Sequence, residues 1–357
     1  MKLTKSSFSE SVKQHIKELD RIMKDSQEML IVVHNDPDPD ALATAAALHH
    51  LIRERYSIPV SIAYGGDIAR AENKALLREL DVQLKQINRI HYDKYDRFAT
   101  VDTQPGAGNN SLDGDIVPHI VVDHHPEQKH VKSDLLVIEP KIGVSATILI
   151  EWLKECEINM PANLATGLSY AISSETQNMG REASVIDIDA YLFVFVKASM
   201  KRLARIINPK RSQAYYEMVA KALHRAMNIR NLICVHLGNI SNVEIVAEMA
   251  DFFMGREHIS WTLCTGRFKN QLVLSLRTSN NQKKANKVLT RIVPDTRNVG
   301  GHDMIAGGRL DLGDGKNKAE EAENELSRNF AESFDYEMTD WSPLLESLTF
   351  TVDIKEK

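Results

Sequence analysis

The 357-residue chain has few cysteines and no long apolar run. Its three cysteines, Cys156, Cys234 and Cys264, are too few for a disulfide framework, and none pairs in the spacing of a thiolate metal site, so we interpret them as buried thiols. No stretch approaches the ~18 apolar residues of a membrane span. The segment 1–20 also lacks the apolar core of a secretory signal. We therefore expect a cytoplasmic protein with no membrane partner.

An excess of positive charge is missing as well. The formal net charge is −5, whereas binding to long duplex nucleic acid rests on lysine and arginine neutralising phosphates. A broad basic face for long duplexes is therefore not expected. A local pocket for a short oligonucleotide or a mononucleotide remains compatible with this charge.

What the chain does have is a pattern of short apolar runs alternating with helical segments. We expect strands at 29–33, 59–64, 97–101, 119–122 and 135–139, and helices at 41–55, 72–80, 144–155 and 163–174. Strands that alternate with helices predict βαβ units. The fold class expected for the N-terminal domain is therefore α/β, with a mostly parallel sheet flanked by helices.

The second half repeats this alternation after a break at 208–211. Residues 183–207 are expected to be largely helical, and 212–230 form an amphipathic pattern with Ser212 as its N-cap. Strands are expected at 232–237, 259–267 and 271–278, and helices at 242–254, 285–293 and 316–334. We predict a first domain over 1–207, a linker helix over 208–230, and a smaller α/β domain over 231–357.

Acidic and imidazole side chains follow three of the predicted strands. The turn from His34 to Asp40 comes after the first strand, Asp102 after another, and Asp123 with His124 and His125 after a third. The carboxyl ends of parallel strands meet at one edge of a sheet, which is where ligands bind in such folds. Carboxylates mixed with imidazole suit Mn²⁺, Mg²⁺ or Zn²⁺. The sequence therefore predicts a divalent-metal site at this edge.

These motifs resemble those of the DHH phosphoesterase family. The resemblance rests on H-x-x-P-D-x-D-A at His34–Ala41, on the isolated Asp102, and on the Asp-His-His triplet that begins at Asp123. It extends to a DHH-associated C-terminal domain through residues 298–302, which end in Gly-Gly-His, and through 306–308. By size and order of parts, the chain is most similar to oligoribonucleases that also dephosphorylate 3′-phosphoadenosine 5′-phosphate.

The resemblance implies two divalent metal ions, of which manganese is the family's usual choice. It assigns His34 and Asp38 to one ion, Asp40 and His124 to the other, and Asp102 to both. It implies that Asp123 supports these ligands and that His125 contacts the substrate phosphate or assists proton transfer.

A fourth family motif normally supplies an Asp followed by Thr. Here the matching acid is Glu175, followed by Thr176. Glutamate can ligate a divalent cation, but its additional methylene group moves the carboxylate oxygens. We expect Glu175 to be a metal ligand whose position alters metal spacing, metal choice or rate.

In the second domain, the resemblance implies that Gly300, Gly301 and His302 bind the substrate. We expect Arg277 to help, because its guanidinium group can bind phosphate through two parallel hydrogen bonds. The family usually has another glycine where this chain has Val299.

The expected activity is hydrolysis of short oligonucleotides or small nucleotide phosphates, in which two metal ions activate a water molecule. Three alternatives remain open from the sequence: an inorganic pyrophosphatase or exopolyphosphatase, an exonuclease on long strands like RecJ, and a nucleotide-binding sensor that has lost catalysis. The resemblance also suggests a homodimer.

Overall fold

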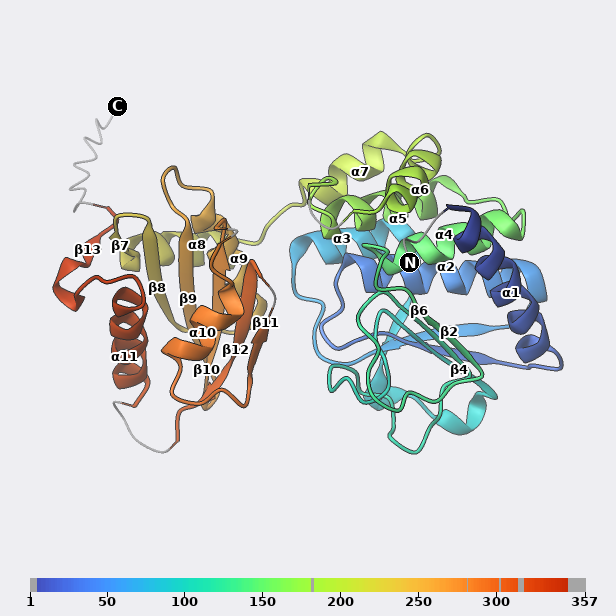
Figure 1. Cartoon of the computed structure of the whole chain (residues 1–357), viewed down its shortest axis with the longest axis horizontal. Helices are drawn as coiled ribbons and strands as arrows, with labels where there is room; N and C mark the ends of the chain where they lie inside the picture. Colours follow the sequence, from blue (N-terminus) through green and yellow to red (C-terminus); the bar gives the residue numbers. More distant parts are fainter. Residues whose placement is uncertain (1–4, 181–182, 281, 302, 314–317, 346–357) are drawn as a thin grey trace, which may run out of the picture. The chain divides into compact units, whose positions relative to one another are not determined.

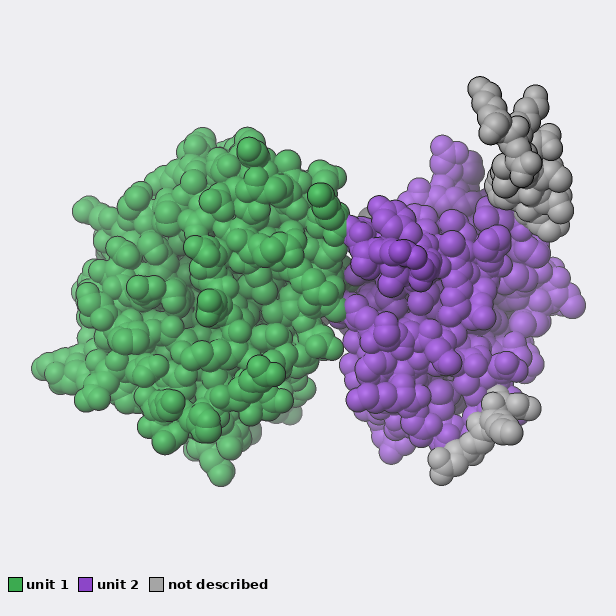
Figure 2. All heavy atoms as spheres, turned by 180° about the vertical axis from the view of Figure 1, so that it is seen from behind, with its two compact units in different colours: residues 1–210 green, residues 211–357 purple. Residues whose placement is uncertain are grey.

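The computed structural model describes residues 5–180, 183–280, 282–301, 303–313 and 318–345. The chain divides between Lys210 and Arg211 into two compact units, coloured separately in Figure 2. The segment that we expected to be a linker helix, 208–230, corresponds to α8 (Gln213–Arg225). This helix packs against β8 (Leu232–Asn239) of the second unit.

The first unit contains a six-stranded sheet in which every pairing is parallel. Its strand order is β3-β2-β1-β4-β5-β6, so the chain winds outward in both directions from β1. The strands are β1 (Met29–Val32), β2 (Val60–Tyr64), β3 (Leu84–Gln86), β4 (Arg97–Val101), β5 (Ile120–Asp123) and β6 (Leu135–Ile138).

Helices gather over one face of this sheet, as Figure 1 shows. They are α1 (Lys5–Met23), α2 (Pro39–Tyr56), α3 (Ala71–Leu80), α4 (Ser145–Glu155), α5 (Ala162–Glu175), α6 (Val185–Phe195) and α7 (Met200–Ile207). Met29, Ile31 and Val101 pack in the main core with these helices. Leu30 and Val32, on the opposite face, pack in a smaller cluster around Tyr95. Burial on both faces explains why β1 consists of apolar residues alone.

The second unit is built on a seven-stranded sheet in the order β11-β12-β10-β9-β8-β7-β13. Among the pairings of its described strands, only that of β8 with β9 is parallel. The remaining strands are β7 (Met227–Ile229), β9 (Trp261–Phe268), β10 (Gln271–Thr278), β11 (Val299–Gly301), β12 (Ile305–Asp311) and β13 (Ser342–Pro343). One core contains residues of α10 (Ala285–Ile292) and α11 (Lys318–Glu332), and the other contains residues of α8 and α9 (Glu244–Met254).

The predicted fold class, a parallel α/β sheet flanked by helices with a second sheet-containing domain, is confirmed. Residues 183–207, which we expected to be largely helical, form two helices, because the chain leaves α6 at Val196 and Ser199 caps α7 by accepting from the Arg202 N–H. None of the helices in the described part of the chain has both the length and the apolar composition that a membrane-spanning helix requires.

Candidate metal centre

The predicted acidic and imidazole residues meet at the carboxyl ends of β1, β4 and β5. The strand order reverses between β1 and β4, and the crevice at such a reversal is the usual ligand site of an open parallel sheet. The turn that begins at His34 follows β1, Asp102 follows β4, and Asp123 is the last residue of β5. The expectation that one sheet edge collects these side chains therefore agrees with the observed topology.

Asp102 lies between two groups of potential ligands. Its Oδ2 is 3.5 Å from His34 Nε2, which is itself 3.6 Å from Asp38 Oδ1. Its Oδ1 is 3.7 Å from His124 Nε2. These separations are longer than a good N–H···O hydrogen bond. Two three-residue sets have ligand atoms mutually within 4.8 Å: His34, Asp38 and Asp102, and Asp102, His124 and His125.

The second group also contains Asp40, at the start of α2. Its Oδ2 is 3.8 Å from His124 Nε2. The same oxygen accepts the Ser145 N–H at 2.7 Å, and Oδ1 accepts the Ala146 N–H at 2.8 Å and the Thr44 hydroxyl at 3.0 Å. Asp40 is therefore held in place by the N-terminus of α4, which favours a negative charge there.

Asp102 is constrained by its backbone as well as by its side chain. Its φ of 56° is in the left-handed region, which residues other than glycine seldom adopt. The Ser145 hydroxyl donates to Asp102 Oδ1 at 2.9 Å. Strained backbone of this kind is concentrated at functional sites. Sequence reasoning missed Ser145, because its position near Asp102 and Asp40 arises only from the tertiary fold.

The carboxylates at this site repel one another unless a cation lies between them. Burial, followed by the negative charges of Asp102 and Asp38, raises the pKa of Asp40 well above its usual range. Glu175 adds to this effect, so it lies close enough to Asp40 to repel it. A divalent cation would offset this repulsion, and hard oxygen ligands with imidazole suit such an ion. The residues therefore fit the metal that the sequence predicts.

The imidazole of His34 responds to the same carboxylates. Burial lowers its pKa, but the neighbouring Asp102 and Asp38 outweigh burial and raise the pKa of His34 well above its usual value. Conversely, although burial raises the pKa of Asp38, His34 and the Ala41 N–H keep it well below the usual value for an aspartate. Asp38 also caps α2 by accepting the Ala41 N–H at 3.0 Å.

His125 is oriented by Asp123. Its Nδ1 lies 2.8 Å from Asp123 Oδ1, and this hydrogen bond, set against burial, raises the pKa of His125 to about 9. The other oxygen of Asp123 accepts from Gln104 Nε2 at 2.7 Å. Gln104 is buried and also accepts the Gln128 N–H, so it holds the Asp123 carboxylate that hydrogen-bonds to His125. Sequence reasoning missed Gln104, which carries no motif signal.

The substrate residues predicted in the second unit fall on β10 and β11. Arg277 is buried, and its Nε donates to Asp251 at 2.6 Å. Gly301 has a φ of 150°, and a Cβ there would lie 2.3 Å from the Ile305 carbonyl oxygen, so β12 itself requires this glycine. A Cβ on Gly300 would meet open space. His302 lies outside the described residues.

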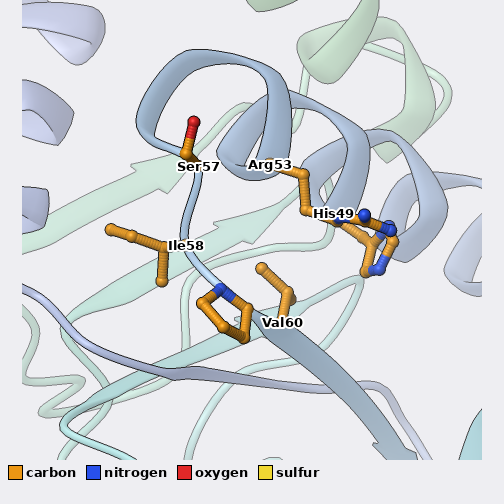
Figure 3. Close-up of a pocket in the computed structure, with 6 residues that line it drawn as sticks. His49, Arg53, Ser57, Ile58 and Val60 are labelled. Carbon is orange, nitrogen blue, oxygen red and sulfur yellow. The ribbon is translucent and has the colours of Figure 1, made fainter.

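A cavity of about 460 Å³ also lies in the first unit, but away from the candidate metal centre (Figure 3). It is lined by His49, Arg53 and Ser57 at the carboxyl end of α2, together with Ile58 and Val60. Asp38 and Asp40 occupy the opposite end of this 18-residue helix, which is about 27 Å long at the usual rise per residue. The cavity and the metal centre are therefore separate features.

Comparison with known proteins gave the following similarities. No protein-family model matches the chain. An uncharacterized protein of Methanocaldococcus jannaschii is 34% identical over 290 residues, which cover 80% of this chain and 58% of that protein. A probable manganese-dependent inorganic pyrophosphatase of Lactobacillus delbrueckii is 26% identical over 182 residues, 50% of this chain and 55% of that protein. The chain thus spans less than two thirds of the length of both relatives.

Among solved structures, an exopolyphosphatase-related protein from Bacteroides fragilis matches with a TM-score of 0.67 and 14% sequence identity. The match covers 88% of this chain and 96% of that protein. Identity this low establishes a shared fold and no more.

Proposed function

We propose that this chain is a DHH-family phosphoesterase that depends on divalent metal ions and hydrolyses phosphate esters of short oligonucleotides or small nucleotides. The observation that carries the proposal is the position of Asp102, whose two oxygens face two different groups of metal-ligand side chains. A single carboxylate shared in this way is suited to two adjacent cations. The buried, mutually repelling carboxylates around it support the same conclusion.

The metal ligands in this proposal are two imidazoles and four carboxylates. His34 and Asp38 would hold one ion, His124 and Asp40 the other, and Asp102 both, while Glu175 would complete the set from the end of α5. Mn²⁺ is the ion proposed, because several relatives are named as manganese-dependent enzymes. When bound, such ions would offset negative charge on a phosphoryl group and make a nucleophile available near neutral pH.

The remaining residues would orient the substrate. Asp123 holds His125 through Nδ1, so that Nε2 of the same ring can donate to a phosphate oxygen or to the leaving oxygen. Gln104 keeps Asp123 in position from the other side. In the second unit, Gly300, with open space beside its α carbon, would allow a ligand to approach the backbone, and Arg277 would attract a phosphate. His302 is retained as a proposed partner of the same phosphate.

A second candidate is hydrolysis of inorganic pyrophosphate. It is favoured by the similarity to the Lactobacillus pyrophosphatases, which covers about half of the chain. Both reactions break a P–O bond at the same metal centre. They differ in the group on the other side of that bond, which is a nucleoside in the first reaction and a phosphate in the second.

The experiment is a substrate panel with added Mn²⁺: a dinucleotide, a five-residue oligoribonucleotide, 3′-phosphoadenosine 5′-phosphate and pyrophosphate. Cleavage of the nucleotide substrates with pyrophosphate untouched supports the first candidate. Hydrolysis of pyrophosphate alone supports the second. If no member of the panel is hydrolysed, the phosphoesterase proposal fails and a non-catalytic nucleotide-binding role takes its place.

The control pair is Asp102→Asn and Asp36→Asn. Asp102→Asn removes the shared charge while preserving shape, so we expect activity to fall at least a hundredfold. Asp36 lies in the same turn as Asp38, and its φ is positive, as it is at Asp102. Its Oδ1 accepts the Asp67 N–H, and an asparagine oxygen can accept the same hydrogen bond. Asp36→Asn should leave the rate within about twofold of the original; an equal loss in both variants would point to misfolding instead.

A further inference from the structure

A second cavity, of about 520 Å³, lies within the second unit between the end of α8, the end of β8 and the start of α11. Its lining includes Lys221, Arg225, Gly238 and Arg267. The volume is within the range of small-molecule sites in proteins. The metal centre lies in the other unit, so neither the motif residues nor their proposed chemistry accounts for this cavity.

The cavity is at the opposite end of the sheet from the glycines of β11. Strand pairing places Gly301 beside Ala306, and the adjoining Ile305 beside Arg277 of β10. That end of β10 pairs with Trp261, where β9 begins. The cavity instead contains Arg267 and Asn239, at the far ends of β9 and β8. It is therefore distinct from the proposed substrate residues of β10 and β11.

Two cationic side chains converge on one glycine in this cavity. Lys221 and Arg225 lie one helical turn apart on α8, on the same side. The Arg225 Nη1 is 2.6 Å, and the Lys221 Nζ 3.5 Å, from the point where a Cβ on Gly238 would stand. Within the described residues, neither cation has a carboxylate partner; Arg225 donates only to the His236 carbonyl, at 3.3 Å. The two positive charges are thus close together and not neutralised by an ion pair.

The third cation, Arg267, is already paired. Its guanidinium group binds both carboxylate oxygens of the buried Glu323. Burial, followed by the charges of Arg225 and Arg267, lowers the pKa of Lys221. The C-terminus of a helix carries a partial negative charge, which favours cations in the last turn of α8. That preference does not explain why two of these cations turn toward the same point. An anion between them would offset their repulsion.

The backbone at Gly238 is shaped for close approach. Between His236 and Asn239, β8 advances three residues while β9 advances from Thr265 to Arg267, so β8 contains one additional residue at this bulge. Gly238 has a φ of 69°, and such bulges redirect side chains and recur beside ligand sites. A side chain at Gly238 would collide with Arg225 and fill the space between the cations.

We propose that Lys221, Arg225 and the backbone at Gly238 bind the phosphoryl group of a small phosphorylated ligand. Glu320, also in the cavity lining, presents a carboxylate that can accept hydrogen bonds from the hydroxyl or amino groups of the same molecule. A phosphorylated metabolite that also carries hydroxyl or amino groups fits this combination better than a bare anion does. The site lies outside the metal centre and is independent of the proposed hydrolytic activity.

The test is calorimetric titration of the full chain, stripped of metal with a chelator, with inorganic phosphate at constant ionic strength. The variant Lys221→Gln/Arg225→Gln removes both charges. The matched control, Arg256→Gln/Lys269→Gln, removes the same charge from exposed positions of the second unit that do not line the cavity. We expect the first variant to bind phosphate at least tenfold more weakly and the control to bind within twofold of the original. Acetate, titrated in parallel, should bind at least tenfold more weakly than phosphate.

Three results would overturn the proposal: no binding of phosphate by the original chain at millimolar concentrations, equal binding by the charge-removed variant, or acetate binding as tight as phosphate. Circular dichroism checks that both variants fold. If the double variant does not fold, hydrogen exchange of the original chain decides the matter. Added phosphate should then protect the peptides covering α8 and residues 236–239, and protection elsewhere alone would count against the site.

Discussion

At Asp102, the residues that the sequence motifs identify are held by residues that no motif identifies. The motif positions could be predicted because each follows a short apolar run that had to be a buried strand. Ser145 could not, since it lies 43 residues from Asp102 along the chain and reaches it only when the first residue of α4 comes beside the end of β4. The left-handed backbone conformation at Asp102 could not be predicted either, because the residue is not a glycine or an asparagine. At the scale of residues, the sequence therefore predicts which side chains gather at the sheet edge better than it predicts the residues that hold them there.

Replacing Ser145 with alanine tests this support directly. The Ser145→Ala variant loses the hydrogen bond to Asp102 Oδ1, while the backbone N–H that binds Asp40 remains. Because residues that orient ligands tune affinity, we expect the dissociation constant for Mn²⁺ to rise about 10–100-fold. Calorimetric titration of the metal-stripped protein measures it. Ser169→Ala is the control, since among the described residues that buried hydroxyl donates only to the Ala165 carbonyl of its own helix. Similar affinities in both variants would refute the role of Ser145.

Whole elements were predicted unevenly, for physical reasons. The predicted bounds of β4 and β10 coincide with the observed ones, because turn residues flank compact apolar runs. β11 was not predicted, because it contains three residues, two of them glycine, and depends on pairing with β12. α1 was also missed, although Phe8, Val12, Ile16 and Leu19 give it a buried stripe at helical spacing. Its low overall hydrophobicity concealed a pattern that the spacing alone would have revealed.

The start of α6 is tied to the start of α4 by one buried carboxylate. Asp187 accepts from Ser184 at its own N-cap, from the Gly143 N–H at 2.9 Å and from the Thr147 hydroxyl at 2.7 Å. Asp187→Ala would leave these donors without an acceptor, so we expect a loss of about 2–4 kcal/mol in the free energy of unfolding. Asp189→Ala, two residues along the same helix, breaks only an exposed ion pair with Lys5 and should cost less than about 1 kcal/mol. Urea denaturation distinguishes the two, and equal losses would contradict this account.

The packing of α1 on α4 should depend on pH through His15. Burial lowers the pKa of His15 to about 4, and its ring lies 5.8 Å from that of Trp152. Above the ordinary pKa of about 6.5, the ring is neutral in both the folded and the unfolded chain, and the free energy of unfolding has its full value. As pH falls from about 6.5 to 4, only the unfolded chain takes up the proton, so stability declines by at most ~3 kcal/mol.

His15→Phe keeps an aromatic ring beside Trp152 and removes this titration. The difference in unfolding free energy between the original and the variant, measured by urea denaturation at several pH values, should therefore change across that window. Other titrating groups cancel in the difference. A difference that stays constant between pH 7 and 4 would show that His15 is not shielded in the folded state.

At the scale of the whole molecule, each unit has its own sheet and its own cores, and the boundary falls between Lys210 and Arg211. The proposed metal ligands all belong to the first unit, whereas the proposed phosphoryl site belongs to the second. Each ligand should therefore stabilise a different part of the chain, and binding can be assigned to a unit by the segment that it protects.

Mn²⁺ should stabilise the first unit and leave the second unchanged. An ion that binds only the folded state adds about 2.7 kcal/mol at a hundred times its dissociation constant. Hydrogen exchange with and without Mn²⁺ reports this gain separately for α2 and α4 in one unit and for β8 and β9 in the other. We expect slower exchange in the first pair alone, and no slowing in Asp102→Asn. Equal protection of both units would mean that they unfold together. Protection confined to the second unit would show that Mn²⁺ binds to residues other than those grouped around Asp102.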